Sequence, residues 1–450
     1  MVRTPSRRLI LSAVTAAPAR DELDALYRRL DWRLLPFLTL CYVFAYLDRI
    51  NIGFAKLQMQ SDLGFSDAVY GLGAGIFFLG YMLFEVPSNL LLPRVGARRT
   101  LSRIMVLWGV TSSCMLFVHD VRAFYTLRFL LGVFEAGFAP GMIFYLTYWY
   151  GAARMARVMA IVMCAGPIGG IVGGPLSSWA MTAFAGANGL AGWQWMFLIE
   201  GLPCVLFGVA AWFFLDDRPA DARWLSAREK QCLSAALTPV PATRHASFAQ
   251  IARDVRVYVM ALAYFCLICG IYAVSFWLPT ILKANGLTGT MAIGFTSAIP
   301  YAAAVVAMLV VSRSSDRHHE RRWHSAVPAL LGAAALAVAT LATGHFVLAL
   351  VAMTVATAMM WTAYTVFWAM PSDYLKGDAA AGGIALINTI GLFGGFLSPT
   401  LIGWVKTLTG SMTAGLFVMV GLLVIGAILL IVNNVSVPKV PKGRRAQERT

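Results

Sequence analysis

Charged residues are scarce in this 450-residue chain, at 13% of the total, whereas soluble globular domains carry about 25%. Hydrophobic residues make up 59%. When two tails and one hydrophilic middle segment are set aside, the remainder divides into twelve apolar stretches of about 20 residues, the length that spans a bilayer as a helix. The composition excludes a soluble protein and predicts an integral membrane protein.

Groups that could support enzyme chemistry are also few. The sequence shows no nucleophile and base constellation, no metal-ligand cluster and no sizeable soluble domain, so we expect no enzyme activity, no cofactor and no metal. A non-transporting receptor or a membrane enzyme is the less favoured alternative. The seven cysteines lie almost all in apolar segments, and we interpret them as packing residues without a disulfide. Cys266 and Cys269 have redox spacing but lack the soluble βαβ context of a redox motif.

Basic residues outnumber acidic ones by 36 to 21, and their placement carries the information. Most of them fall in the two tails, in the middle segment and in the loops on one side of the predicted membrane. By the positive-inside rule this side is cytoplasmic and holds both termini. The charge therefore orients the protein and does not indicate nucleic acid. Residues 7–19 imitate a secretory signal, but the arginines just before the first span favour a cytoplasmic N-terminus.

The hydrophilic middle segment divides the chain into two halves of six spans, an arrangement that suggests a binding site between the halves near the bilayer midplane. The predicted organisation is a cytoplasmic tail (1–33), a six-helix bundle (34–215), a cytoplasmic linker (216–251), a second six-helix bundle (252–433) and a basic cytoplasmic tail (434–450). A basic loop recurs at the same place in both halves, which predicts a pair of gating loops. Their candidate residues are Arg94, Gly96, Arg98 and Arg99 in the first half and Asp316, Arg317, Arg321 and Arg322 in the second.

Four charged residues stand inside the apolar segments of the first half. Asp48 and Arg49 lie side by side in the first span, where an ionised side chain costs at least about 2.5 kcal/mol near the bilayer centre. Arg128 and Glu135 lie seven residues apart in the fourth span, on one helical face and about 10 Å apart along the axis. We expect all four groups to share the central and outer part of one cavity.

The chemistry of this set suits the transport of an anion with a proton. Arginine forks match carboxylates bidentately, and carboxyl groups in a low-dielectric cavity can carry protons. The structural alternative pairs Asp48 with Arg128 and Glu135 with Arg49 as ion pairs that only hold helices together. We favour a functional role for these four residues over a purely structural one, because buried ion pairs rarely add net stability over apolar packing. For Glu85 we favour structural or gating contacts with the arginine-rich loops, and the same holds for Glu200.

The two basic loops resemble the signature loop of the major facilitator superfamily. Residues 47–51, 80–89, 128–137 and 195–203 are similar to its anion:cation symporter branch, which includes tartrate, 4-hydroxyphenylacetate and phthalate permeases. The resemblance covers about residues 30–435. It implies an all-α membrane protein with twelve transmembrane helices in two six-helix bundles, the major facilitator fold. One departure is Pro93, where the superfamily loop usually has an aspartate; the second half keeps that residue as Asp316.

The resemblance also implies roles for the intramembrane residues. Asp48 and Glu135 match the proton-coupling acids of the branch, and Arg49 and Arg128 match the arginines around its substrate anion. Further substrate contacts are implied at Tyr46, Tyr81, Trp368 and Asn388.

The expected function is proton-coupled import of a small organic carboxylate across the bacterial inner membrane by alternating access. The substrate would be a hydroxy dicarboxylate such as tartrate, or an aromatic carboxylate. The expected partners are this anion, protons and the lipid bilayer, with no nucleic acid, and the protein would be a monomer. A proton-coupled exporter of drugs or metabolites with the same fold is the alternative.

Overall fold

The structure is a computed structural model that describes residues 20–237, 248–342, 344–375 and 380–433. Within these ranges every regular element is a helix. Twelve candidate spans are long and apolar enough to cross a membrane, which confirms the predicted all-helical membrane fold. The signal-like residues 7–19 and the basic tail from residue 434 lie outside the described residues.

The first six spans are formed by nine α-helices, because the first, fourth and fifth spans are each divided in two. These helices are α1 (Arg20–Ile50), α2 (Ile52–Leu63), α3 (Asp67–Val95), α4 (Ala97–Cys114), α5 (Val121–Glu135), α6 (Phe138–Thr147), α7 (Ala152–Met163), α8 (Ala165–Ala183) and α9 (Gly192–Phe214). Two short 3-10 turns follow α4 and α8, namely η1 (Met115–Phe117) and η2 (Ala187–Gly189).

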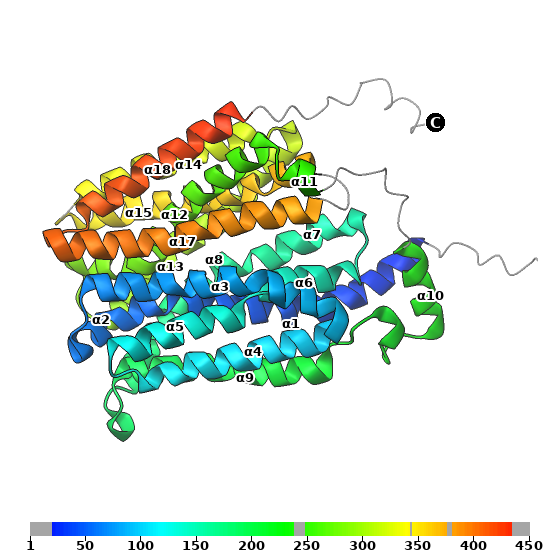
Figure 1. Cartoon of the computed structure of the whole chain (residues 1–450), viewed down its shortest axis with the longest axis horizontal. Coiled ribbons are helices and arrows are strands. Elements are labelled where there is room, and N and C mark those ends of the chain that lie inside the picture. The colour runs from blue at the N-terminus through cyan, green and yellow to red at the C-terminus, as the bar shows by residue number, and fades with distance from the viewer. Residues whose placement is uncertain (1–19, 238–247, 343, 376–379, 434–450) are drawn as a thin grey trace, which may run out of the picture.

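The second six spans are more continuous. They are α12 (Val255–Ala284), α13 (Thr290–His318), α14 (Arg322–Leu341), α15 (Phe346–Phe367) with α16 (Ala369–Tyr374), α17 (Ala380–Thr409) and α18 (Thr413–Val432). Figure 1 shows α12, α14, α15, α17 and α18 gathered in one half of the molecule and α1, α3, α4, α5 and α9 in the other. The chain thus forms two six-helix bundles that lie against each other.

Two of the breaks in the first half fall beside candidate functional residues. α1 ends at Ile50, directly after Asp48 and Arg49, and α2 begins two residues later. α5 ends at Glu135, and Gly137 then adopts a φ of 87°, a left-handed conformation that glycine accepts without steric cost. Irregular backbone at membrane depth is tolerated where it is buried in protein or lines a cavity. The charged residues beside these breaks, Asp48, Arg49 and Glu135, are all buried.

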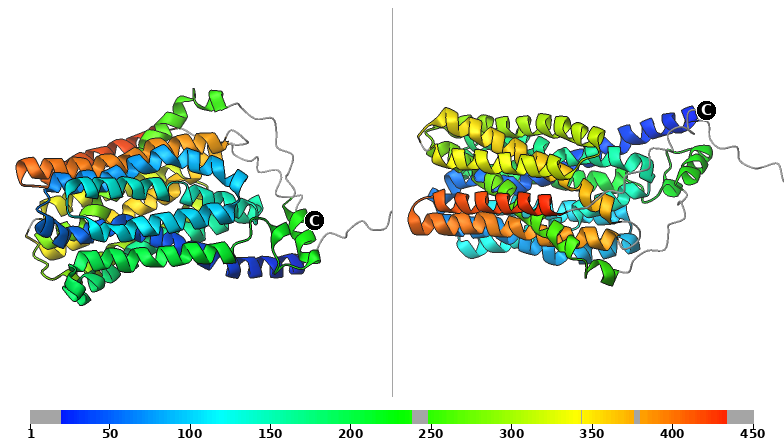
Figure 2. Two further views of the ribbon diagram at one scale, coloured as in Figure 1. Left: turned by 60° about the horizontal axis from the view of Figure 1, so that its bottom comes forward. Right: turned by 90° about the horizontal axis from the view of Figure 1, so that it is seen from above.

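Small residues bring the two halves into close contact along two helix pairs, α3 with α17 and α8 with α13. Figures 1 and 2 show α17 running alongside α3. A Cβ atom added to Gly71 would lie 2.3 Å from the carbonyl oxygen of Pro399, and one added to Gly174 would lie 2.5 Å from that of Gly294. These glycines permit backbone-to-backbone packing, as small residues commonly do between membrane helices.

The bundle has two ends, which we name by what they carry. The linker end holds α10 (Ala227–Ala236) and the start of α1, and the distal end holds the turn between α2 and α3 (Figure 1). At the distal end Asp67 accepts from Lys56 at 2.6 Å and from Lys406 of the second half at 3.1 Å. The Lys56 ammonium also lies 3.8 Å from the centroid of the Trp277 ring. We call these four residues the distal lock.

The first part of the linker is folded onto the first half. Ser226 and Glu229 form a capping box at the start of α10, and Glu229 pairs with Arg29 of α1 at 2.5 Å. The hydrogen bond from the Ser226 backbone lowers the pKa of Glu229. The Arg33 guanidinium lies 4.6 Å and 4.7 Å from the ring centroids of Phe214 and Trp224. The linker thus fastens the projecting part of α1, seen in Figure 2.

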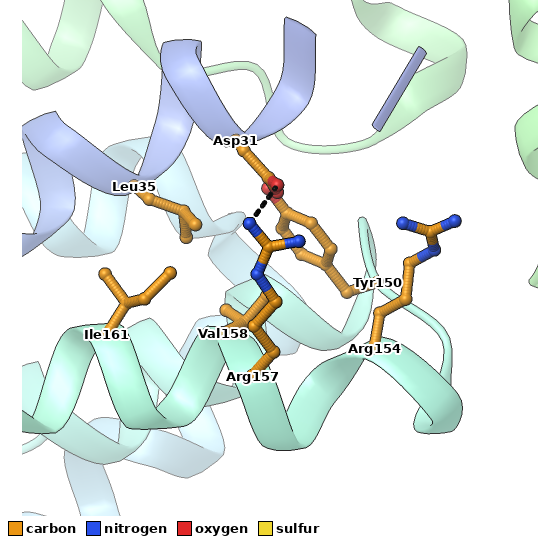
Figure 3. A pocket seen from close by; sticks show the side chains of 7 residues that line it. All are labelled: Asp31, Leu35, Tyr150, Arg154, Arg157, Val158 and Ile161. Atoms are coloured by element: carbon orange, nitrogen blue, oxygen red, sulfur yellow. Dashed lines mark ion pairs between the residues drawn. The ribbon is translucent and has the colours of Figure 1, made fainter. Parts of the chain in front are cut away.

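The start of α1 is also held against α7. Figure 3 shows a pocket between these elements, with Asp31 and Leu35 on one side and Arg157 and Ile161 on the other. An Arg157 nitrogen lies 3.9 Å from an Asp31 oxygen, and Arg154 pairs with Asp24. This pocket lies at the linker end, away from the intramembrane charges.

Candidate functional site

Asp48 is fully buried at the end of α1 and is surrounded by neutral donors. From α4 it accepts hydrogen bonds from Trp108 Nε1 at 2.6 Å and Ser112 Oγ at 2.9 Å. The Cys204 thiol of α9 donates at 3.2 Å and the Asn51 amide at 3.4 Å. Because four donors converge on one carboxyl group, Asp48 is integrated into the first bundle without an ion pair.

Arg49, the next residue, has different partners, one in each half of the molecule. One terminal nitrogen forms an ion pair with Glu135 of α5, and the other donates to the Tyr272 hydroxyl of α12 at 2.8 Å. The guanidinium carbon lies 5.3 Å and 5.5 Å from the ring centroids of Phe77 and Tyr81. The second carboxylate oxygen of Glu135 is buried and has no hydrogen-bond partner. Arg49 therefore connects the first half to the second at the interface.

Arg128 is fully buried, yet its terminal nitrogens have no partner. Its Nε donates to the Gly73 carbonyl at 3.1 Å, while Nη1 and Nη2 make no hydrogen bond. Its guanidinium carbon lies 5.3 Å from the Phe77 ring, the same distance as that of Arg49. Two guanidinium groups thus flank one aromatic ring, and one of them keeps both terminal nitrogens available for an oxygen ligand.

Of the two ion pairs that we considered as a structural alternative, the structure contains one. The pair of Glu135 with Arg49 is present, whereas Asp48 bonds neutral donors and Arg128 bonds a backbone carbonyl. Arg49 thus has a buried carboxylate partner, whereas the terminal nitrogens of Arg128 have none.

Two of the four further candidates, Tyr46 and Asn388, make contacts across the interface of the two halves. Tyr46 contacts the second half through Ser275 at 3.2 Å and through the Trp361 ring at 5.6 Å between centroids. Asn388 of α17 donates to Glu85 of α3 at 2.8 Å. Tyr81 stands beside Arg49, and Trp368 packs edge-on against Tyr264 at 4.9 Å.

Several residues of this region were missed from the sequence. Tyr272, Ser275 and Tyr301 of the second half reach Arg49 or Tyr46 directly or through one hydroxyl. Their hydroxyl groups in apolar segments were the available signal, because a polar side chain in a membrane span needs a partner. The Ser112 hydroxyl carries the same signal on α4. The sequence did not show which helices lie together.

Glu85 and Glu200 do not contact the arginine-rich loops, contrary to our expectation. Glu85 accepts from Asn388 across the interface, and its other oxygen is buried without a partner. Glu200 accepts from Ser177 at 2.7 Å and from Asn51 at 3.0 Å. Both acids are thus bound to buried polar side chains rather than to surface arginines.

The first basic loop is reduced to a single residue between two helices. Helix α3 continues to Val95 and α4 begins at Ala97, so Gly96 alone separates them, with a φ of 97°. The Asp217 carboxylate of the linker fits the space beside Gly96 and accepts from the Arg98 backbone at 2.8 Å.

The second basic loop supplies its own acid. Asp316 pairs with Arg321, which also lies 3.9 Å from Asp373 of α16. Arg317 is in the last turn of α13, Arg322 begins α14, and in the first half Arg94 is in the last turn of α3 and Arg99 in the first turn of α4. Gating by these eight residues stays a prediction.

No group of three or more histidine, cysteine, aspartate or glutamate side chains that could hold a metal ion occurs in the described part of the chain. Within the same residues all seven cysteines are free. The site is therefore built from arginine, carboxyl, hydroxyl, amide and aromatic groups. Such groups bind and orient a small polar ligand.

Comparisons with known proteins agree with this geometry. A family model described as Major Facilitator Superfamily matches residues 38–399. The chain is 47% identical over 433 residues to an Agrobacterium vitis protein named "Putative tartrate transporter", covering 95% of this chain and 96% of that protein. It is 46% identical to the Pseudomonas putida protein named "Putative metabolite transport protein NicT" over 90% of this chain and 94% of that protein. A "Quinolone resistance transporter" of Acinetobacter baumannii is 40% identical over 89% of this chain and 93% of that protein.

Solved structures share the fold at low sequence identity. A bacterial homologue of the human lysosomal transporter Spinster superposes with a TM-score of 0.74 and 16% identity, covering 90% of this chain and 97% of that one. A D-xylose-proton symporter superposes with a TM-score of 0.73 and 14% identity, covering 89% of this chain and 97% of that one. The resemblance found in the sequence is thus confirmed: the chain belongs to the major facilitator superfamily, whose members are membrane transporters and not enzymes.

Proposed function

We propose that this transporter imports a small organic carboxylate together with protons across the bacterial inner membrane. The substrate is a hydroxy dicarboxylate such as tartrate, or an aromatic carboxylate. The names of the Agrobacterium vitis and Pseudomonas putida relatives support a small metabolite as substrate. The protein acts as a monomer, with both termini and the linker end in the cytoplasm, as the positive-inside rule favours.

The observation that carries the proposal is the pair of unpartnered terminal nitrogens of Arg128. A buried guanidinium without an acceptor is costly in a membrane interior. Both nitrogens are fully enclosed beside Phe77, which also contacts Arg49. A substrate carboxylate would supply the missing acceptors through two parallel charge-assisted hydrogen bonds. The aromatic and hydroxyl groups of the second half, among them Tyr272 and Tyr46, would enclose the remainder of the substrate.

The pairing of Arg49 with Glu135 supports proton coupling. A proton on Glu135 removes its charge and releases Arg49 to bind the anion. When the anion leaves, Arg49 attracts Glu135 again and the proton departs. Asp48, next to Arg49 in sequence, holds a second proton among its four neutral donors.

Alternating access would come from rocking of the two halves, with residues 34–215 and 252–433 as the moving units. The distal lock and the glycine contacts of α3 with α17 would hold the distal end closed. The tight basic loops at the linker end would brace each half as it turns. We place the substrate site between these two gates.

The proposal is tested with purified protein in liposomes that contain a trapped pH-sensitive dye, at equal pH on both sides. Tartrate, a sugar acid and an aromatic carboxylate are added outside in separate trials. Acidification of the lumen with one class establishes inward proton symport and identifies the substrate class. Protein-free liposomes report passive leakage of each acid. Uptake of labelled anion without any pH change would contradict proton coupling.

Export is the second candidate, because one relative that aligns over most of the chain is named a quinolone resistance transporter. An exporter would exchange an internal compound for external protons. In the same liposomes, proton movement driven by a fluoroquinolone and by none of the small carboxylates would favour export. The Arg128 site favours an anionic substrate, since unpaired buried arginines suit a carboxylate better than a lipophilic cation.

A further inference from the structure

A second acid lies behind Asp48, outside the substrate site. Glu200 of α9 is fully buried. One of its carboxyl oxygens accepts from Ser177 Oγ of α8 at 2.7 Å, and the other accepts from Asn51 Nδ2 at 3.0 Å. None of the ion pairs formed by the described residues involves Glu200. Its partners are therefore neutral, in contrast to those of Glu135.

Asn51 joins this acid to Asp48. The same amide nitrogen that donates to Glu200 lies 3.4 Å from an Asp48 oxygen. Cys204, one turn after Glu200 on α9, donates to the other Asp48 oxygen at 3.2 Å. The break between α1 and α2 places Asn51 between the two carboxyl groups. We call Asp48, Asn51 and Glu200 the acid bridge.

Two features indicate that the acid bridge holds a proton. Two ionised carboxylates that share one amide, both enclosed in protein, repel each other strongly, and one proton between them removes this repulsion. The carbonyl oxygen of Asn51 is buried and has no partner. An amide can donate to an ionised carboxylate and accept from a protonated one. Asn51 therefore suits a pair in which one acid is charged and the other is neutral.

The surroundings of the bridge contain few competing charges. Glu200 faces Asp48 from α1 and the Ser177 hydroxyl from α8. Asp48 faces Trp108 and Ser112 of α4, the Cys204 thiol of α9, and at longer range Glu135 and Arg128 of α5. Cys41 of α1 lies near Cys204. Arg128 is the cation in this set, and it donates to a backbone carbonyl rather than to either acid.

We propose that Glu200 and Asp48 share one proton across Asn51, so that Glu200 is a further proton-holding residue of the transporter. Asn51 is a positioning residue, which turns its nitrogen toward whichever acid is ionised and its oxygen toward the protonated one. The inference deepens the proposed function and rests on it for its consequence in transport. Proton sharing itself can be measured without any substrate.

The test is infrared spectroscopy of the purified protein in lipid during a pH titration, with the proton as the only ligand. The carbonyl band of protonated carboxyl groups is followed for wild type, Glu200→Gln, Asp48→Asn and Asn51→Ala. The shared proton predicts that either acid variant moves the titration midpoint of the remaining acid to lower pH by about one unit, because its charged neighbour is gone. Asn51→Ala is expected to change both midpoints.

Two controls separate proton sharing from a structural role. Ser177→Ala removes a donor from Glu200 but leaves the bridge intact, so the coupling between the two acids should persist. Glu200→Asp should restore a shared titration. Midpoints of Asp48 that stay unchanged in Glu200→Gln would overturn the proposal. If Glu200→Gln does not fold, unchanged midpoints in Asn51→Ala would overturn it equally.

The dye-loaded liposomes distinguish this inference from the proposed function. Wild-type protein that carries an anion without proton movement would contradict the proposed symport, whatever the infrared titration shows. Coupled transport by wild type, with a titration of Asp48 that is independent of Glu200, would overturn the acid bridge alone.

Discussion

Arg49 donates a 2.8 Å hydrogen bond to the hydroxyl group of Tyr272, and this contact joins the proposed substrate site to the opposite half of the molecule. The same arginine pairs with Glu135 of its own half. One guanidinium group is therefore shared between the element that would carry the proton and the element that would close over the substrate. A change in the charge of Glu135 can therefore affect the second half through the Arg49 side chain alone.

Replacement of Arg128 by alanine should weaken substrate binding. The substitution removes two charge-assisted hydrogen bonds, each worth about 1.5–3 kcal/mol, so we expect the half-saturation concentration to rise by at least roughly tenfold to hundredfold, the loss expected for one such bond. Arg122→Ala is the matched control, because Arg122 is exposed at the start of the same helix. The measurement is the concentration dependence of labelled anion uptake. An unchanged value for Arg128→Ala would remove this residue from the substrate site.

Neutral replacements of the two coupling acids should separate transport from its driving force. Glu135→Gln keeps the shape of the side chain but cannot gain or lose a proton, and Asp48→Asn does the same at the other position. We expect both variants to exchange internal for external substrate while failing to accumulate it in response to a pH gradient. Accumulation at the wild-type level in either variant would contradict its role. Thermal stability in detergent controls for folding.

Loss of Asp67 should open the distal end. Asp67→Ala leaves the buried Lys56 and the facing Lys406 without their shared carboxylate, which disfavours their close approach. Spin labels at Ser61 and Thr409, in a background without native cysteines, should show a longer distance between the halves. Asp120→Ala, at an exposed distal-end acid outside the lock, should leave the distance unchanged. Equal distances in both variants would refute the lock.

A methyl group at Gly71 should keep the halves apart. Its Cβ would lie 2.3 Å from the Pro399 carbonyl oxygen, closer than atoms can approach, so helices α3 and α17 must separate. We expect Gly71→Ala to reduce transport strongly and to lengthen the same spin-label distance. Gly421→Ala is the control, because nothing lies within 4 Å of its added Cβ. Normal transport by Gly71→Ala would contradict the close packing.

The docked linker helix should loosen in acid. The pKa of Glu229 is lowered, first by its hydrogen bond with the Ser226 backbone, so its contribution is complete above the pKa of the unfolded chain and is lost as the pH falls through the folded value. Hydrogen exchange of the α10 amides, corrected for the intrinsic rate, should therefore quicken on acidification. Glu229→Gln should abolish this dependence.

The same helix provides a test of its cap. Ser226→Ala removes the side chain that accepts from the Glu229 backbone at 3.2 Å, a loss of about 1 kcal/mol. Exchange of the α10 amides should then become about fivefold faster. Ser372→Ala, at an exposed serine of α16, should not alter it. Identical exchange in wild type and Ser226→Ala would show that the cap does not stabilise α10.

The fold could be predicted from the sequence because a membrane imposes one requirement on every span. Each apolar stretch must satisfy its own backbone as a helix, so counting the apolar stretches predicted the same number of spans as the structure contains. Ends were harder. The sequence predicted a basic loop that contains Arg94, Gly96, Arg98 and Arg99, but Gly96 alone supplies the turn, and helical geometry continues through Pro93.

The site could be predicted in part. The intramembrane charges Asp48, Arg49, Arg128 and Glu135 are conspicuous in sequence, and the structure brings Arg49 and Glu135 into contact. The partners of Asp48 were not accessible, because Trp108 and Cys204 are ordinary packing residues until helix neighbours are known. Pairing across the interface, as between Glu85 and Asn388, depends on three-dimensional register that no local pattern encodes.

The distal lock has an electrostatic consequence for the arrival of substrate. Lys56 and Asp67 belong to the same half and remain together when the halves part, whereas Lys406 belongs to the other half. Opening therefore leaves Lys406 as an uncompensated cation at the mouth. A fixed positive charge there attracts anions from solution and raises their rate of association, an effect that dissolved salt screens. Capture of a carboxylate should thus slow with ionic strength, while its release should not.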